Sequence, residues 1–76
     1  ALSKNQIQRI QKRISEIEVE IPRLENELGL LSEKLTLPEI ATDHQKLANG
    51  TAEYEKMQSK IQDLYDEWEK LAQEIS

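Results

Sequence analysis

The sequence lacks most of the residues that build compact mixed folds or stapled domains. It has no cysteine and no phenylalanine, only two glycines and two prolines, and aromatic residues make up 4% of it. Without cysteine no disulfide and no thiolate metal site can form, and this composition fits a reducing, cytoplasmic setting. No apolar run approaches the ~18 residues that a membrane span needs. Few glycines and prolines among many charged residues are typical of long helices.

The charge of the chain is unevenly distributed. Charged residues make up 33% of the 76 residues and the formal net charge is −5, so the chain as a whole is not expected to attract nucleic acid or anionic lipid. Residues 1–13, however, contain four basic and no acidic side chains. The 15 acidic residues and the other six of the 10 basic residues all lie in 14–76. The averaged charge therefore hides a basic N-terminal segment.

Two runs of apolar residues follow the heptad spacing of a coiled coil, in which steps of three and four alternate. The first run has no interruption, and the second is interrupted only by a glycine. The first comprises Ile7, Ile10, Ile14, Ile17, Ile21, Leu24, Leu28, Leu31 and Leu35; the second comprises Leu47, Gly50, Tyr54, Met57, Ile61, Leu64, Trp68, Leu71 and Ile75. Each run places one apolar stripe, here called the seam, on a helix.

A short connection joins the two runs, which predicts an all-α fold: two long antiparallel helices that form an intramolecular coiled-coil hairpin about 45 Å long. Pro38 should end the first helix, because the residue before a proline is pushed out of α space. Thr42 followed by Gln45 resembles a capping box for the second helix, and Asp43 is a rival cap. We expect residues 1–76 to form one domain, with helices over about 4–36 and about 43–75 and a turn over about 37–42. We expect a monomer because the loop supplies the partner helix; self-association is the alternative.

Two residues disturb the expected helices. Pro22 lies just outside the first seam, and since the seam stays in phase across it, we expect a bent helix rather than two separate ones. Gly50 lies in the second seam and would face the partner helix. It either leaves room for a large residue such as Leu31 or is a weak point with no role.

The heptad register gives the basic residues of the N-terminal segment two different orientations. With Ile7 at position a, Arg13 falls at g and should approach Glu67, and Glu20 should approach Lys60, whereas Glu27 would meet Glu53 unfavourably. Arg9 and Lys12 fall at c and f, which point away from the partner helix. The candidate nucleic-acid-binding residues are Lys4, Arg9, Lys12 and Arg13. The alternative is a solvated helix surface, since so few cations support only weak, salt-sensitive binding.

No arrangement typical of an enzyme or a metal site is present in the sequence. His44 is the one histidine, and with Glu39 and Asp43 it provides too few ligands for a metal site, so we expect a surface histidine. There is no phosphate-binding loop and no nucleophile elbow. We therefore expect neither catalysis nor a cofactor in this chain.

The three aromatic residues could stack on bases, but a packing role explains them better. Tyr54 and Trp68 occupy seam positions, and Tyr65 lies at position e, at the edge of the seam. We therefore expect them to fill the core, with Tyr65 the most exposed of the three.

Three segments in a fixed order are more specific than the heptads. The chain opens with "LSKNQIQRIQKRI", continues after the first run with "LTLPEIATDHQKL" and closes with "LYDEWEKL". The residues that carry the resemblance are Leu2, Ser3 and Lys4 at the start, Leu37, Pro38 and Glu39 at the turn, and Leu64, Tyr65, Glu67, Trp68, Glu69 and Leu71 near the end. Together these segments, which span nearly the whole chain, resemble the C-terminal coiled-coil domain of ABC-F family ATPases of the Uup-like group.

The resemblance implies that this chain is one part of a larger protein and that the catalytic activity belongs to the other parts. ABC-F proteins are soluble, have two ATPase cassettes and act mainly on the ribosome as translation factors, and the C-terminal extension of Uup-like members resembles a nucleic-acid-binding module, to which DNA binding is attributed. The expected partners are therefore DNA or ribosomal RNA and the parent's ATPase cassettes, with no membrane. The ATP sites would lie outside this fragment, and a first residue of Ala1 rather than methionine fits an excised domain.

Two functions follow as alternatives. In the first, the chain is an accessory C-terminal domain that contacts nucleic acid or the ribosome through the basic segment, or through the closed tip around residues 38–44. In the second, it is a structural spacer or a protein–protein interaction module that binds no nucleic acid.

Overall fold

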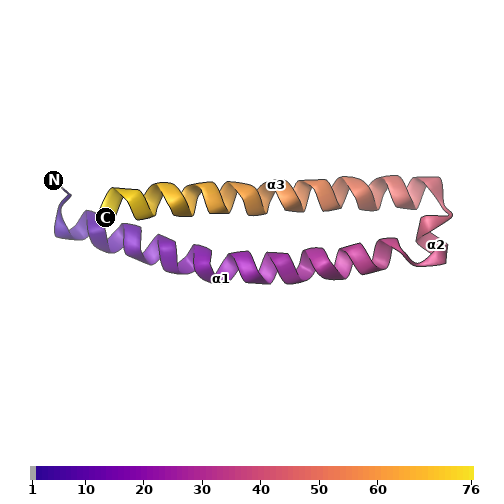
Figure 1. Cartoon of the computed structure of the whole chain (residues 1–76), viewed down its shortest axis with the longest axis horizontal. Helices are drawn as coiled ribbons and strands as arrows, with labels where there is room; N and C mark the ends of the chain where they lie inside the picture. Colours follow the sequence, from indigo (N-terminus) through magenta and orange to yellow (C-terminus); the bar gives the residue numbers. More distant parts are fainter. Residues whose placement is uncertain (1) are drawn as a thin grey trace.

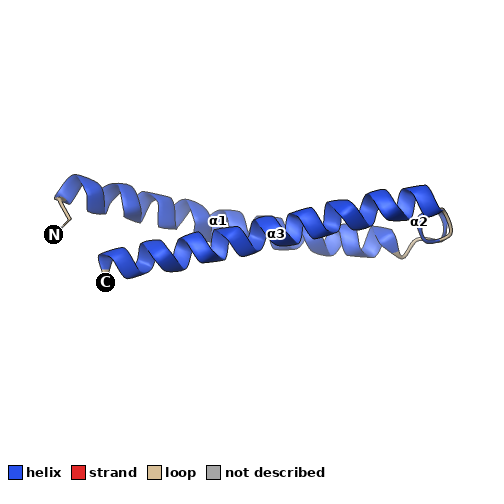
Figure 2. Cartoon of the chain, turned by 90° about the horizontal axis from the view of Figure 1, so that it is seen from above, coloured by secondary structure: helices blue, strands red, loops and turns tan. Residues whose placement is uncertain are grey.

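The computed structural model describes residues 2–76, and it contains three helices, α1 (Lys4–Leu35), α2 (Pro38–Ala41) and α3 (His44–Ile75). α1 and α3 run antiparallel and in contact, with α2 at the closed tip and both chain ends at the open end (Figures 1 and 2). The predicted antiparallel helical hairpin is confirmed. The molecule measures 56 × 15 × 15 Å, longer than predicted, because each long helix has 32 residues and the tip adds to them.

The core lies in the middle of the hairpin, where the two seams meet. Its buried residues are Ile17, Ile21 and Leu24 of α1 and Ile61 and Leu64 of α3, and Leu28, Met57, Trp68 and Leu71 pack against them. Ile17 is fully buried. Every other seam residue is at least half-buried, because two helices cover each other on one side only. The heptad prediction therefore identified the packing surface of both helices.

The ends of α1 are set by local hydrogen bonds. Ser3 Oγ accepts from the backbone N–H of Gln6 at 3.2 Å, and Gln6 Oε1 accepts from the backbone N–H of Ser3 at 2.8 Å. This capping box satisfies two backbone donors at the start of the helix. At the other end α1 stops at Leu35, and Leu37 has the extended backbone (φ −65°, ψ 136°) expected of a residue before proline.

The turn differs from the sequence-based expectation in two ways. Residues 38–41 form the short helix α2 instead of an irregular turn, with Pro38 at its first position. The N-cap of α3 is Asp43 and not Thr42: Asp43 Oδ1 accepts from the backbone N–H groups of Gln45 and Lys46, both at 3.0 Å. Thr42 ends α2 instead, where its hydroxyl donates to the Pro38 carbonyl. The Thr42 capping box was therefore wrong, because α2 takes that residue.

Pro22 and Gly50 are both accommodated within continuous helices. α1 continues through Pro22, and its ribbon is bent in Figure 1, in accord with the predicted bend. At Gly50 an added Cβ would collide with Cδ2 of Leu35. The residue that fills the space beside the glycine is thus Leu35, one seam position beyond the expected Leu31.

Candidate nucleic-acid interface

Three of the four candidate cations form an exposed surface on the first turns of α1, here called the basic end and consisting of Lys4, Arg9 and Lys12. All three side chains are exposed. Within residues 2–76 none of the three takes part in an ion pair. Arg9 and Lys12 occupy heptad positions c and f, on the side of α1 opposite α3. Their charges are therefore available to a ligand that approaches from outside the hairpin.

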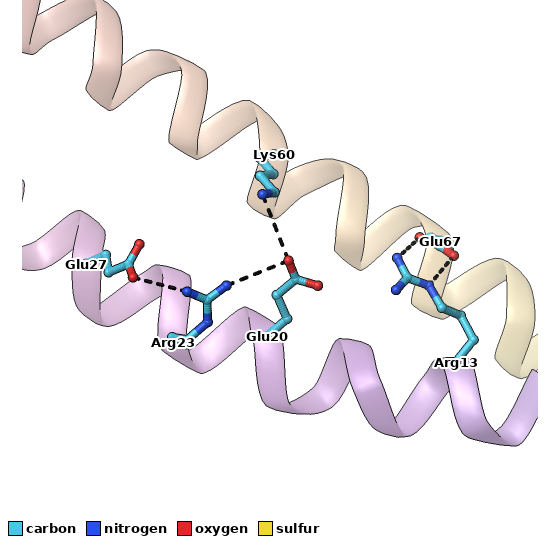
Figure 3. Close-up of polar contacts among 6 residues, drawn as sticks. All are labelled: Arg13, Glu20, Arg23, Glu27, Lys60 and Glu67. Carbon is cyan, nitrogen blue, oxygen red and sulfur yellow. Dashed lines mark hydrogen bonds and ion pairs between the residues drawn. The ribbon is translucent and has the colours of Figure 1, made fainter.

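The fourth candidate, Arg13, is engaged within the hairpin instead. Its Nε lies 2.7 Å from Glu67 Oε2 and its Nη2 lies 2.8 Å from Glu67 Oε1, so the two groups form a bidentate pair between α1 and α3 (Figure 3). This hydrogen bonding raises the pKa of the Arg13 guanidinium and lowers the pKa of the Glu67 carboxyl. The predicted pairing of Arg13 with Glu67 is confirmed. Arg13 is therefore not counted as part of the basic end.

The same flank of the hairpin continues as a charge network. Lys60 Nζ lies 3.9 Å from Glu20 Oε1, as the register predicted (Figure 3). Arg23 contacts Glu20 at 3.9 Å and Glu27 at 3.2 Å. Sequence reasoning missed Arg23, although its spacing of four residues to Glu27 is typical of helix-surface pairs. Glu27, for which an unfavourable meeting with Glu53 was expected, thus has a cationic partner on its own helix.

The opposite flank carries an open groove that sequence reasoning did not identify. Ile21, Pro22 and Trp68 form its apolar part, and Glu18, Glu25 and Tyr65 complete its lining; this is called the aromatic groove below. Tyr65 is 43% exposed, as expected for a residue at the edge of the seam. Burial, and then the nearby Glu25 carboxylate, raise the pKa of the Tyr65 phenol. The clue in the sequence was the recurrence of glutamate at position e of α1.

The described part of the chain holds no catalytic or metal-binding cluster. No group of three or more His, Cys, Asp or Glu side chains in residues 2–76 is arranged to hold a metal ion. His44 is an exposed residue at the start of α3. In the same residues no helix combines the length and apolar character needed to cross a bilayer.

Comparison with protein families identifies the domain. The family model described as ABC transporter C-terminal domain matches residues 6–73, which include the first seam, the second seam except Ile75, the tip and the Arg13–Glu67 pair. Comparisons with curated proteins and with solved structures found no match. Since the family model accounts for most of the chain, this protein belongs to the ABC transporter C-terminal domain family and is an accessory domain of an ABC protein.

Proposed function

We propose that this hairpin is the accessory C-terminal domain of an ABC-F ATPase of the Uup-like group, and that it contacts DNA or ribosomal RNA through the basic end. Residues 1–76 would act as one domain beside the parent's ATPase cassettes, where the ATP sites lie. The observation that carries the proposal is that Lys4, Arg9 and Lys12 are exposed and make no ion pair among the described residues.

The arrangement of the other charges supports this surface over the rest of the molecule. The acidic residues lie in 14–76, so a polyanion would be repelled along most of the hairpin. Arg13 adds little to the basic end because Glu67 offsets its charge. At most about three phosphate contacts are then available, and three contacts predict an affinity loss of about 40-fold between about 50 and 200 mM salt.

The test is a titration of labelled duplex DNA and of a ribosomal RNA fragment at both salt concentrations. The variant is Arg9→Glu/Lys12→Glu. The matched control is Lys56→Glu/Lys70→Glu, which makes the same change in net charge at two exposed lysines of α3 that form no ion pair in residues 2–76. We expect the wild type and the control to bind in a salt-dependent manner and the basic-end variant to lose binding.

Two outcomes would overturn the proposal. If neither nucleic acid binds at the lower salt concentration, direct nucleic-acid contact by this domain is excluded. If the control variant loses as much affinity as the basic-end variant, the attraction depends on net charge and not on this surface. Either result would favour the alternative function, a spacer or protein–protein interaction module.

A further inference from the structure

The two flanks of the hairpin have different charge patterns. The flank shown in Figure 3 mixes both signs, and its carboxylates Glu20, Glu27 and Glu67 each contact a cation. On the other flank the heptad e and b positions carry no lysine or arginine over residues 8–32 of α1 and 48–72 of α3; Lys4, also at position e, lies at the open end, 14 residues before Glu18. The occupants of these positions in the two ranges are Gln8, Gln11, Ser15, Glu18, Pro22, Glu25, Gly29 and Ser32 of α1 and Ala48, Thr51, Glu55, Gln58, Gln62, Tyr65, Glu69 and Ala72 of α3. The part of this flank that holds the aromatic groove is therefore acidic, and no lysine or arginine lies at these positions beside it.

The two carboxylates of the groove are held by weak, neutral donors. Glu18 Oε2 accepts from Trp68 Nε1, and Glu25 Oε2 accepts from the Tyr65 hydroxyl, both at 3.3 Å. Among residues 2–76 neither carboxylate has a cationic partner. An ionised carboxylate offers about four acceptor positions, so most of the acceptor capacity stays free. The rings thus orient the carboxylates at the groove without neutralising them.

We propose that the aromatic groove docks an arginine-bearing cationic segment of a partner protein. A guanidinium group is planar, stacks on aromatic faces and forms paired hydrogen bonds with a carboxylate. The groove supplies both elements side by side, since Tyr65 and Trp68 lie next to Glu25 and Glu18. A polyanion would be repelled by the same carboxylates, so this surface is distinct from the basic end and does not depend on its function.

The spacing of the carboxylates specifies the probe. Glu18 and Glu25 are two helical turns apart on α1, which corresponds to about 10 Å along the helix. Three residues of a polyproline II segment span nearly the same distance, at about 3.1 Å each, and since this conformation has three residues per turn, side chains three residues apart point to the same side. The probe is therefore a capped peptide of sequence Ser-Arg-Ser-Ser-Arg-Ser. Peptides with lysine or glutamine in place of arginine serve as its comparisons.

The experiment is a titration of the protein with each peptide, read by the fluorescence of Trp68, the only tryptophan, and by the NMR shifts of Tyr65. We expect saturable binding of the arginine peptide, weaker binding of the lysine peptide and none of the glutamine peptide. Glu18→Gln/Glu25→Gln should weaken the affinity about tenfold. The matched control Glu33→Gln/Glu39→Gln, which alters two exposed carboxylates outside the groove, should bind as the wild type does.

A second variant protects the test against a loss of folding. Tyr65→Ala removes an exposed ring and should weaken binding of the arginine peptide while the circular dichroism spectrum stays helical. Equal binding of the arginine and lysine peptides, equal loss in the control variant, or no saturable response would overturn the proposal. So would a change in the sedimentation of the peptide-free protein on substitution of Glu18 and Glu25, which would assign the groove to a second copy of the chain.

Discussion

At the residue scale, the adjacent cations Lys12 and Arg13 have separate roles, because successive residues on a helix point about 100° apart. Lys12 points to solvent, whereas Arg13 reaches across to Glu67 on α3. The Arg13 and Glu67 side chains are 39% and 40% exposed, so water screens the pair and its contribution to stability is small. The pair is a marker of the register in which the two seams bring the helices together.

The Arg13–Glu67 pair predicts a pH-dependent contribution to stability. The pKa of Glu67 is lowered in the folded state, so its contribution is present above the ordinary carboxyl pKa of about 4.3 and is lost as pH falls through the folded-state value. We expect Glu67→Gln to lower the melting temperature by a few degrees at most at neutral pH. The difference in melting temperature between the variant and the wild type should begin to shrink at about pH 4 and disappear at lower pH.

The measurement is thermal melting of both proteins, followed by circular dichroism across that pH range. The matched control is Glu69→Gln, which removes an exposed carboxylate of the same helix that forms no ion pair among the described residues. It should melt close to the wild type at neutral pH. If the difference in melting temperature between Glu67→Gln and the wild type stays constant down to acid pH, the ionised Glu67 carboxylate contributes nothing to stability.

At the scale of the elements, the tip is built from three short features in sequence. α1 stops at Leu35, three residues before Pro38, α2 makes a single turn, and Asp43 caps the start of α3. Each break leaves backbone groups that need partners. Side chains of Thr36, Thr42 and Asp43 supply them through bonds to neighbouring backbone groups. The reversal of chain direction is therefore stabilised locally and does not depend on the central core.

The assignment of the α3 cap yields a direct comparison of two adjacent residues. Asp43→Ala removes the acceptor of two backbone N–H groups and should lower the free energy of unfolding by about 1 kcal/mol. Thr42→Ala removes one hydroxyl bond at the end of α2 and should cost less than about 0.5 kcal/mol. Urea denaturation of both variants measures the difference. A larger loss for Thr42→Ala than for Asp43→Ala would contradict the observed cap.

At the scale of the whole molecule, the hairpin is a thin rod with a small central core. A rod of 56 × 15 × 15 Å leaves most side chains in contact with water. Apart from Tyr65 in the aromatic groove, the large apolar residues that remain exposed are scattered: Val19 and Leu30 lie at separate positions along α1, and Leu2 and Leu37 lie just outside its two ends. Scattered exposed residues of this kind do not form an association surface. The apolar seams of α1 and α3 instead pack against each other.

This arrangement predicts a monomer. The tip holds α1 and α3 together, so the second helix is present at a high effective concentration and competes with any second chain. Sedimentation equilibrium at several protein concentrations should give the monomer mass of 8.8 kDa throughout. A mass that rises with concentration towards that of a dimer or a four-helix bundle would contradict the prediction.

The sequence by itself determined the pairing of the two long helices. Alternating steps of three and four placed the seam residues on one stripe of each helix, and the short connection made the helices antiparallel. Register followed from the same rule, which is why the Arg13–Glu67 and Glu20–Lys60 pairs could be named in advance. These features depend on spacing along the chain, which a sequence displays directly.

Only the tertiary structure decided the details at the tip and on the flanks. Asp43 rather than Thr42 caps α3, and Leu35 rather than Leu31 packs against Gly50, because α2 occupies residues that pattern alone assigned to a turn. The aromatic groove likewise depends on contacts between residues about 40 to 50 positions apart in sequence. Which side chains meet across such a distance depends on where the bent α1 and α3 lie in space, and residue spacing does not encode this.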